Sequence, residues 1–258
     1  MRLRLLLFVV AVFGLSVWAA NATADPTAGP PICSSAGTAL SGPYQNLTVT
    51  GNAYVPAGDT LSVSRNLTLA PGSCLDAFSL STVKVGGDVL VGRAATLALG
   101  CSPGALGPPI PQPPCGVTTT TDWVGGNILA DHAMTMYLTD VTVRGNVVSV
   151  GGGPGRTLDP YINFPIKENT IGGSLIVEGW QGAWFGVIRN HVSGSVLLAR
   201  NVGLTTGDGG APDSTEVVDN TVGGSLICLA NNPMAQVGDS GGGPNIVAGL
   251  KLGECASL

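Results

Sequence analysis

Two acidic residues, Glu168 and Asp219, are the candidates for acid–base catalysis in this chain. Each stands directly before an asparagine in a repeated pattern, and Arg189 holds the same place in the copy between them. If the copies stack as neighbouring strands about 4.8 Å apart, the two carboxyl groups are separated by a distance that an inverting glycosidase can use. The intervening arginine favours a structural ion ladder, which Asp140 extends, because a nearby cation keeps a carboxyl ionised whereas a general acid needs a raised pKa.

A second motif, Gly238-Asp239-Ser240-Gly241-Gly242-Gly243-Pro244, is similar to the nucleophile motif GDSGGP of chymotrypsin-like serine proteases, with one additional glycine. That chemistry requires a histidine base and a buried acid. The chain has two histidines, of which His132 lacks the sequence context found in those proteases. His191 occupies a position that the other copies of the repeat fill with threonine. A glycine-rich turn is therefore the favoured interpretation of the motif.

Three aromatic residues, Trp180, Trp184 and Phe185, gather in a segment that departs from the repeat. Exposed rings of this kind form platforms on which sugars stack, so these residues are the candidate binding site. The favoured alternative is that they cover the hydrophobic core at a corner of the fold.

The repeat itself is written three times near the C-terminus, beginning at Asn169, Asn190 and Asn220. It persists upstream in degenerate form and can be aligned on one glycine per copy. The residues two before, two after and four after that glycine are almost all apolar, and this period-two alternation predicts short strands with one buried face. The aligned glycines are Gly51, Gly87, Gly126, Gly145, Gly173, Gly194 and Gly224.

These glycines are spaced 36, 39, 19, 28, 21 and 30 residues apart. The intervals fit a unit of about 19–21 residues, with two units in some gaps and turn-rich insertions in others. A unit of that length closes one coil of a β-solenoid, in which each strand pairs in parallel with its counterpart one coil away. The sequence therefore predicts an all-β fold, a right-handed parallel β-helix (β-solenoid) of roughly ten coils.

The asparagines that open the three clear copies, Asn169, Asn190 and Asn220, are predicted to form a structural ladder. Amide side chains at equivalent turns of successive coils hydrogen-bond along the stack.

Composition restricts the partners of the protein. Only 10% of the residues are charged, 39 are glycine, and the net charge is −5 with a pI near 4.8. Nucleic acid and anionic membrane surfaces both favour a basic face, so neither is an expected partner. The sequence indicates no cofactor.

Six cysteines in an exported chain predict three disulfides that staple the fold. Six cysteines allow fifteen pairings. The favoured set joins sequence neighbours, Cys33 with Cys74, Cys101 with Cys115, and Cys228 with Cys255. The first and last pairs fall near the two ends of the predicted rod, and the middle pair closes a proline-rich insertion. The spacing is not of the C-x-x-C kind, so no metal site is expected.

The N-terminus predicts export. Residues 1–24 contain two arginines, an apolar run and small residues before a cleavage site, which is the arrangement of a signal peptide. An uncleaved membrane anchor is the alternative, but the apolar run is shorter than a membrane-spanning helix requires. After cleavage no membrane span is expected. Residues 25–258 are predicted to form one β-solenoid domain, with an N-terminal cap at about 25–45 and a C-terminal cap at about 229–258.

The C-terminal region resembles a known group of proteins. It runs from Asn220–Cys228 through Asn231-Asn232-Pro233 and Gly243–Val247 to Gly249 and Gly253-Glu254-Cys255. The region is similar to the C-terminal repeat and cap of a group of bacterial secreted right-handed β-helix proteins of uncharacterised function. The resemblance covers about 90 residues. It implies the β-helix fold and the Cys228–Cys255 pairing, and it implies no catalytic residue.

Two functions are compatible with these observations. The favoured one is a non-enzymatic secreted or cell-surface module that binds a cell-wall or extracellular polysaccharide, or a surface protein. The alternative is a polysaccharide-active enzyme, a lyase or a glycoside hydrolase, because β-helices can host such chemistry.

Overall fold

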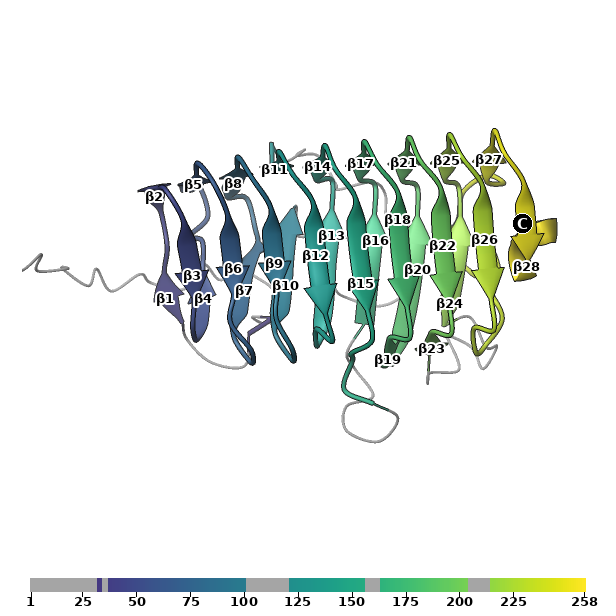
Figure 1. Ribbon diagram of the computed structural model, residues 1–258, viewed down its shortest axis with the longest axis horizontal. Helices are drawn as coiled ribbons and strands as arrows, with labels where there is room; N and C mark the ends of the chain where they lie inside the picture. The colour runs from purple at the N-terminus through teal and green to yellow at the C-terminus, as the bar shows by residue number, and fades with distance from the viewer. Residues whose placement is uncertain (1–31, 34–36, 101–120, 156–162, 204–213) are drawn as a thin grey trace, which may run out of the picture.

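The computed structural model describes residues 32–33, 37–100, 121–155, 163–203 and 214–258. Apart from one short 3-10 helix, η1 (Glu254–Ser257), the regular structure of these residues consists of β-strands. The strands form a rod in which successive coils lie side by side along the long axis (Figure 1).

Three long parallel sheets make up the rod, and the chain passes through sheets A, B and C in turn. Sheet A contains β1 (Thr38–Ala39), β4 (Asn52–Tyr54), β7 (Cys74–Phe78), β10 (Thr96–Gly100), β13 (Thr135–Thr139), β16 (Asn163–Lys167), β20 (Trp184–Ile188) and β24 (Thr215–Val218). Sheet B contains β2 (Gly42–Tyr44), β5 (Thr60–Val63), β8 (Thr82–Val85), β11 (Trp123–Val124), β14 (Thr142–Val143), β17 (Thr170–Ile171), β21 (His191–Val192), β25 (Thr221–Val222) and β27 (Ile246–Val247). Sheet C contains β3 (Leu47–Val49), β6 (Leu67–Leu69), β9 (Val89–Val91), β12 (Ile128–Asp131), β15 (Val147–Val150), β18 (Leu175–Glu178), β22 (Val196–Ala199), β26 (Leu226–Leu229) and β28 (Lys251–Gly253). Two short strands, β19 (Gln181–Gly182) and β23 (Val202–Gly203), pair between sheets C and A.

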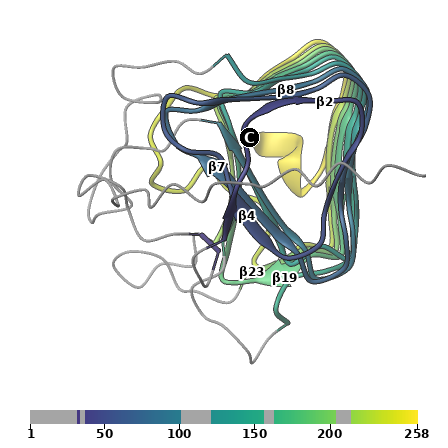
Figure 2. The same cartoon turned by 90° about the vertical axis from the view of Figure 1, so that its left-hand side faces the viewer.

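The fold prediction is confirmed, since the strands of the described residues form a right-handed parallel β-helix whose sheets surround one interior (Figure 2). Sheet A has eight strands and sheets B and C have nine each. In the described residues the rod therefore has eight full coils, numbered from the first (β1–β3), and part of a ninth, rather than about ten.

The register of the first coils corrects the sequence alignment. Leu47 pairs with Leu67, which pairs with Val89, so the first two coils have Gln45 and Arg65 where later coils have the aligned glycine. Gly51 belongs to a different turn and was aligned wrongly. The interval from Gly87 to Gly126 holds one coil rather than two, because Ile128 pairs directly with Val89.

The core consists of aliphatic columns that run along the rod. Val143, Ile171, Val192 and Val222 lie at equivalent places in adjacent strands of sheet B, and each is at most 1% exposed. The inward-facing residues of sheets A and C complete the same interior. The predicted continuous core is therefore confirmed.

The glycine column at the corner between sheets B and C has a steric cause. A Cβ atom on Gly126 would lie 2.3 Å from Oδ1 of Asp88. That oxygen, one coil earlier, accepts a hydrogen bond from the backbone N–H of Asn127 at 2.7 Å. The glycine thus leaves room for a polar side chain that ties two coils together. We call the recurring set the corner ladder, which consists of Asn46, Asn66, Asp88, Asn127, Asn146, Ser174, Ser195 and Ser225.

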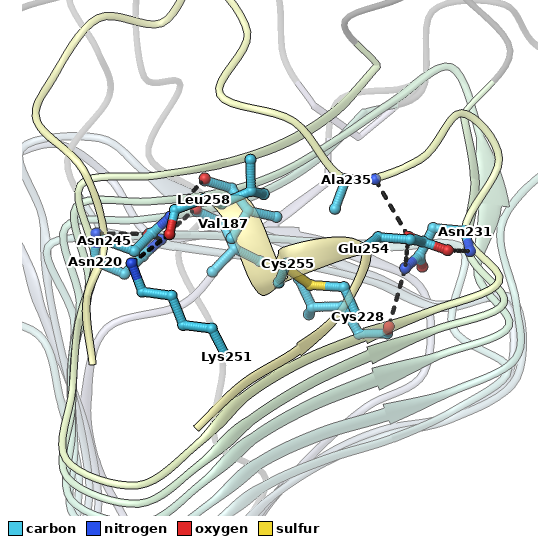
Figure 3. Close-up of a disulfide and its surroundings, with 12 residues drawn as sticks. Val187, Asn220, Cys228, Asn231, Ala235, Asn245, Lys251, Glu254, Cys255 and Leu258 are labelled. Carbon is cyan, nitrogen blue, oxygen red and sulfur yellow. Dashed lines mark hydrogen bonds between the residues drawn. A yellow bond between two sulfur atoms is a disulfide. The ribbon is translucent and has the colours of Figure 1, made fainter. Parts of the chain in front are cut away.

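Both ends of the rod carry the predicted disulfides, Cys33–Cys74 and Cys228–Cys255. The third predicted pair, Cys101–Cys115, lies outside the described residues. At the C-terminal end, η1 lies across the open interior of the last coil, and its residue Cys255 is fully buried (Figure 3). Strands β1 and β2 fall within the predicted N-terminal cap and already belong to the first coil.

Candidate functional site

The three asparagines of the repeat lie in one buried column between sheets A and B. Oδ1 of Asn190 accepts from the backbone N–H and Nδ2 of Asn169, at 3.0 and 2.9 Å. Nδ2 of Asn190 donates to the carbonyl oxygen of Ile166 and to Oδ1 of Asn220. Asn245 continues the column by accepting two hydrogen bonds from Asn220. Each amide therefore ties three successive coils together, as a structural ladder requires.

A second buried ladder, which the sequence analysis missed, lies on the other side of sheet A. Oδ1 of Asn231 accepts from the backbone N–H and Nδ2 of Asn201. Glu254, in η1, ends this ladder by accepting from the backbone N–H and Nδ2 of Asn231, each at 2.8 Å, and from the backbone N–H of Ala235 (Figure 3). A carboxylate suits this end because all three partners are donors.

Asp122 lies in the same column as the asparagines between sheets A and B. The neighbouring coils have Val83 and Val141 at this position. Its two oxygens accept from the backbone N–H groups of Val83 and Gly100, at 2.7 and 2.9 Å. Burial raises the pKa of the Asp122 carboxyl to about 6, although both hydrogen bonds lower it. Asp122 thus serves as a ladder residue at a point where both partners are donors.

Glu168, Arg189 and Asp219 form a column at the corner after sheet A, as the repeat predicts. All three have left-handed backbone conformations, with φ of 60°, 53° and 57°. Nη2 of Arg189 lies 2.8 Å from Oε1 of Glu168, and both side chains are mostly buried. Among the ion pairs of the described residues, none joins Arg189 to Asp219, so the ladder is incomplete. Instead, Nη1 of Arg189 donates to the carbonyl oxygen of Ser240.

The serine of the GDSGGGP motif lies in a turn against sheet A. Its hydroxyl donates to Glu216, and the backbone N–H groups of Asp239 and Ser240 also donate to that carboxyl. Glu216 is fully buried, and burial raises the pKa of its carboxyl. Of the two histidines, His132 pairs with Asp131 and His191 lies in β21, so neither hydrogen-bonds to Ser240. This geometry is that of a turn anchored to the rod.

The predicted aromatic platform is wrong for two of its three residues. Trp180 and Phe185 are fully buried, and both rings pack against Phe164, with centroids 5.2 and 5.7 Å away. They complete the core at a corner, and their faces are closed to a sugar. Trp184 lies on the outer side of sheet A, where Nζ of Lys167 is 4.8 Å from its ring centroid.

A different aromatic residue lines a groove on the outer face of sheet B. The groove has a volume of about 510 Å³ and crosses the first four coils. Trp123 lies at one end and Pro43 at the other, with Ser62 and Lys84 between them in the same outward-facing column, whereas Tyr44 packs against the core. The remaining lining residues are Gln45, Val63, Ser64 and Gly86.

Trp123 is held flat across the corner by its neighbours. A Cβ atom on Gly125 would lie 2.7 Å from Cη2 of the indole, so the ring occupies the space of the missing side chain. The guanidinium of Arg144, one coil further, lies 5.1 Å from the ring centroid. The side chain at 123 is therefore an oriented, half-buried ring rather than a freely rotating one.

The groove is a cationic part of an acidic protein. Arg65 flanks it in the second coil, Lys84 lies in it in the third, and Arg144 flanks it in the fifth. Within the described part of the chain, none of these three forms an ion pair, and the groove lining contains no carboxylate. The site can therefore offer a ring face and unpaired positive charge to a ligand.

One feature of the sequence predicts this site. Trp123 occupies the column that Thr142, Thr170 and Thr221 fill in other coils. An aromatic residue in an outward-facing threonine column is an outlier of the kind that marks a binding surface.

Comparison of the chain with protein-family models, with curated proteins and with solved structures gave no match. The stacked parallel sheets define the protein as a β-solenoid, and no family is identified. No helix within the described ranges is long and apolar enough to cross a membrane. In those same ranges no group of three or more His, Cys, Asp or Glu side chains could hold a metal ion.

Proposed function

We propose that this protein is an exported, non-enzymatic β-solenoid that binds an acidic polysaccharide in the sheet B groove. The observation that supports the proposal is the oriented ring of Trp123 beside the unpaired cations Lys84 and Arg144. A pyranose presents C–H groups that stack on an aromatic face, and a uronate adds a carboxylate that pairs with lysine or arginine.

The shape of the site fits a polymer. Neighbouring coils are about 4.8 Å apart, so Pro43 and Trp123, three coils apart in the outward column, are separated by about 14 Å along the rod. An extended chain of a few sugar units lying along the rod contacts both ends of such a groove. Serine hydroxyls at 62 and 64 supply hydrogen-bonding groups between them.

Binding without turnover is favoured over hydrolysis by the content of the groove. A glycosidase that acts through two carboxyl groups needs both of them beside the scissile bond, and no carboxylate lines this groove in the described residues. Glu168 and Asp219, the pair predicted from the sequence, lie at the corner after sheet A rather than in the groove. Glu168 is engaged by Arg189.

Export is part of the proposal. The N-terminal sequence has the arrangement of a signal peptide, and two disulfides staple the rod. Disulfides of this kind persist in oxidising compartments. A polysaccharide ligand outside the cytoplasm is consistent with both features.

The proposal can be tested by affinity electrophoresis of the purified mature protein through gels that contain polygalacturonate or neutral dextran. We expect retardation by the uronate polymer only, and a loss of about tenfold in affinity for Trp123→Ala, because a stacked ring contributes about 1.4 kcal/mol. Trp184→Ala is the matched control, since that ring also lies on an outer face beside a cation.

Two outcomes would overturn the proposal. One is wild-type migration that is unchanged by every acidic polysaccharide tested. The other is equal retardation of the Trp123→Ala and wild-type proteins. Release of new reducing ends or unsaturated products from the polymer would support the enzyme alternative instead.

A further inference from the structure

A continuous aliphatic stripe runs along the outer face of sheet C. One outward-facing residue from each of seven successive coils contributes to it, and parallel pairing aligns them in a single column. Three members, Leu90, Leu129 and Leu252, are 36%, 38% and 42% exposed, and the others are half-buried. We call this column the sheet C stripe: Leu90, Leu129, Val148, Ile176, Leu197, Ile227 and Leu252.

Stacking within the sheet does not by itself explain aliphatic residues here. The outward column of sheet B provides an internal comparison, because its parallel strands stack in the same way and have threonine at 142, 170 and 221. Soluble monomers rarely expose apolar patches larger than a few hundred Å². A contiguous apolar patch of about this size is often a functional surface, so the stripe is a candidate interface.

The relief of the face is different in its two halves. The N-terminal half contains a shallow groove of about 500 Å³, lined in part by Thr68, Leu90, Gly92 and Leu129. In the C-terminal half the outward side chain of Leu229, beside the stripe, is 47% exposed. A hollow in one half and a projection in the other is the pattern that a two-fold interface requires, since each patch must meet the other in the second copy.

We infer that the sheet C stripe is the interface of an antiparallel dimer of this chain. A two-fold axis along the strand direction, between the fifth and sixth coils, places each coil opposite a defined coil of the second copy. Val148 then faces Ile176, Leu129 faces Leu197, and Leu90 faces Ile227 of the second copy. Leu229, at the edge of the stripe, faces the hollow at Gly92.

Charge is consistent with the same arrangement. Asp131, in the fourth coil, and Arg200, in the seventh, border the same edge of the stripe, and their side chains are 75% and 67% exposed. The proposed axis brings Asp131 of one copy opposite Ala199 of the other, next to Arg200. Each has a partner within its own chain, so the contact would join the His132–Asp131 hydrogen bond and the Glu178–Arg200 ion pair into one network.

The size of the face predicts a low affinity. Seven coils at about 4.8 Å and strands of four residues at about 3.3 Å give a flat face of about 400 Å² on each copy. Two copies therefore bury about 800 Å² in total, which is below the roughly 1,200 Å² of standard specific interfaces and in the range of weak, transient ones. The dimer should therefore dissociate on dilution.

Sedimentation equilibrium of the mature protein over a wide concentration range tests the inference. We expect a reversible dimer, and at least a tenfold weaker association for Ile176→Asp, whose side chain lies beside the proposed axis in both copies. Thr170→Asp is the matched control, because it places the same charge on the exposed outer face of sheet B in the same coil. Circular dichroism shows whether each variant remains folded.

A double variant keeps the test valid if Ile176→Asp fails to fold. Cysteines at Leu129 and Leu197 lie three coils apart in one chain, about 14 Å, which is too far for a disulfide. In the proposed dimer they face each other, so mild oxidation should give a covalent dimer. A protein that is monomeric at all concentrations would overturn the inference. So would a dimer that forms no such cross-link and is unaffected by Ile176→Asp, and so would a different protein seated on the stripe.

Discussion

Removing one amide from the buried asparagine ladder should cost the protein several kcal/mol. In Asn190→Ala, the backbone N–H of Asn169 loses its acceptor at 3.0 Å, and the carbonyl oxygen of Ile166 loses its donor at 2.8 Å. The two amide-to-amide hydrogen bonds of the column disappear as well. A buried orphan donor costs about 1–3 kcal/mol and each lost hydrogen bond about 1 kcal/mol, so we expect a total of about 3–5 kcal/mol.

The assay is urea unfolding of the mature protein, with thermal unfolding as a second measure. A loss of that size lowers the melting temperature of a domain of this length by roughly 10 °C. Asn146→Ala is the control, because Asn146 also serves in a ladder but is exposed to water, which can replace its hydrogen bonds. Equal losses for the two variants, or a loss below about 1 kcal/mol for Asn190→Ala, would refute the reasoning.

Three further predictions concern single positions. The pKa of the Asp122 carboxyl is raised from 3.8 to about 6 in the folded protein, so its contribution to stability is complete below pH 4 and is lost as the pH rises through 6. Two pKa units correspond to about 3 kcal/mol. The free energy of unfolding of the wild type minus that of Asp122→Asn should therefore fall by about that amount from pH 4 to 7. A difference that stays constant with pH would exclude a raised pKa at Asp122. Glu254→Gln replaces one carboxylate oxygen, which accepts hydrogen bonds, by an amide group that donates them to partners that are themselves donors. The free energy of unfolding should fall by about 1–3 kcal/mol, and the backbone amides of η1 should exchange their hydrogens faster. Unchanged exchange in η1 would contradict the role of Glu254 at the end of the ladder. Gly126→Ala should be destabilising, because its Cβ would lie 2.3 Å from a side-chain oxygen, whereas Gly51→Ala should be neutral, because nothing lies within 4 Å of the added atom. Similar melting temperatures for the two alanine variants would contradict the register described above.

The sequence predicted the fold because the repeat carries strong signals in its later copies. Apolar columns at fixed places around the glycine define both the coil length and the inward face, and the structure confirms them. The first two coils were misaligned because Gln45 and Arg65 replace that glycine. The glycine is required where a polar side chain of the preceding coil occupies its Cβ position, and single-sequence patterns do not show that contact.

The surfaces were harder to predict than the core. Trp180 and Phe185 were candidate binding residues because they are aromatic and lie outside the repeat. The segment departs from the repeat at a corner of the coil, and there both side chains point into the interior. Trp123 lies within the repeat, where its exposure depends on facing outward from sheet B beside Gly125. The sheet C stripe was overlooked because buried and exposed columns of that sheet are both aliphatic, so the hydrophobicity pattern alone does not separate them.

The ladders, the groove and the stripe all depend on coils that stack in parallel and in register. Cysteines at Thr142 and Thr170, which pair in adjacent strands of sheet B, test this directly. Their Cα atoms should be about 4.8 Å apart, within the range of a disulfide, whereas those at Thr142 and His191 should be about twice as far apart. Mass spectrometry after mild oxidation should therefore find a cross-link within one chain in the first variant and none in the second. The opposite result, or no cross-link in either, would contradict the stacked arrangement.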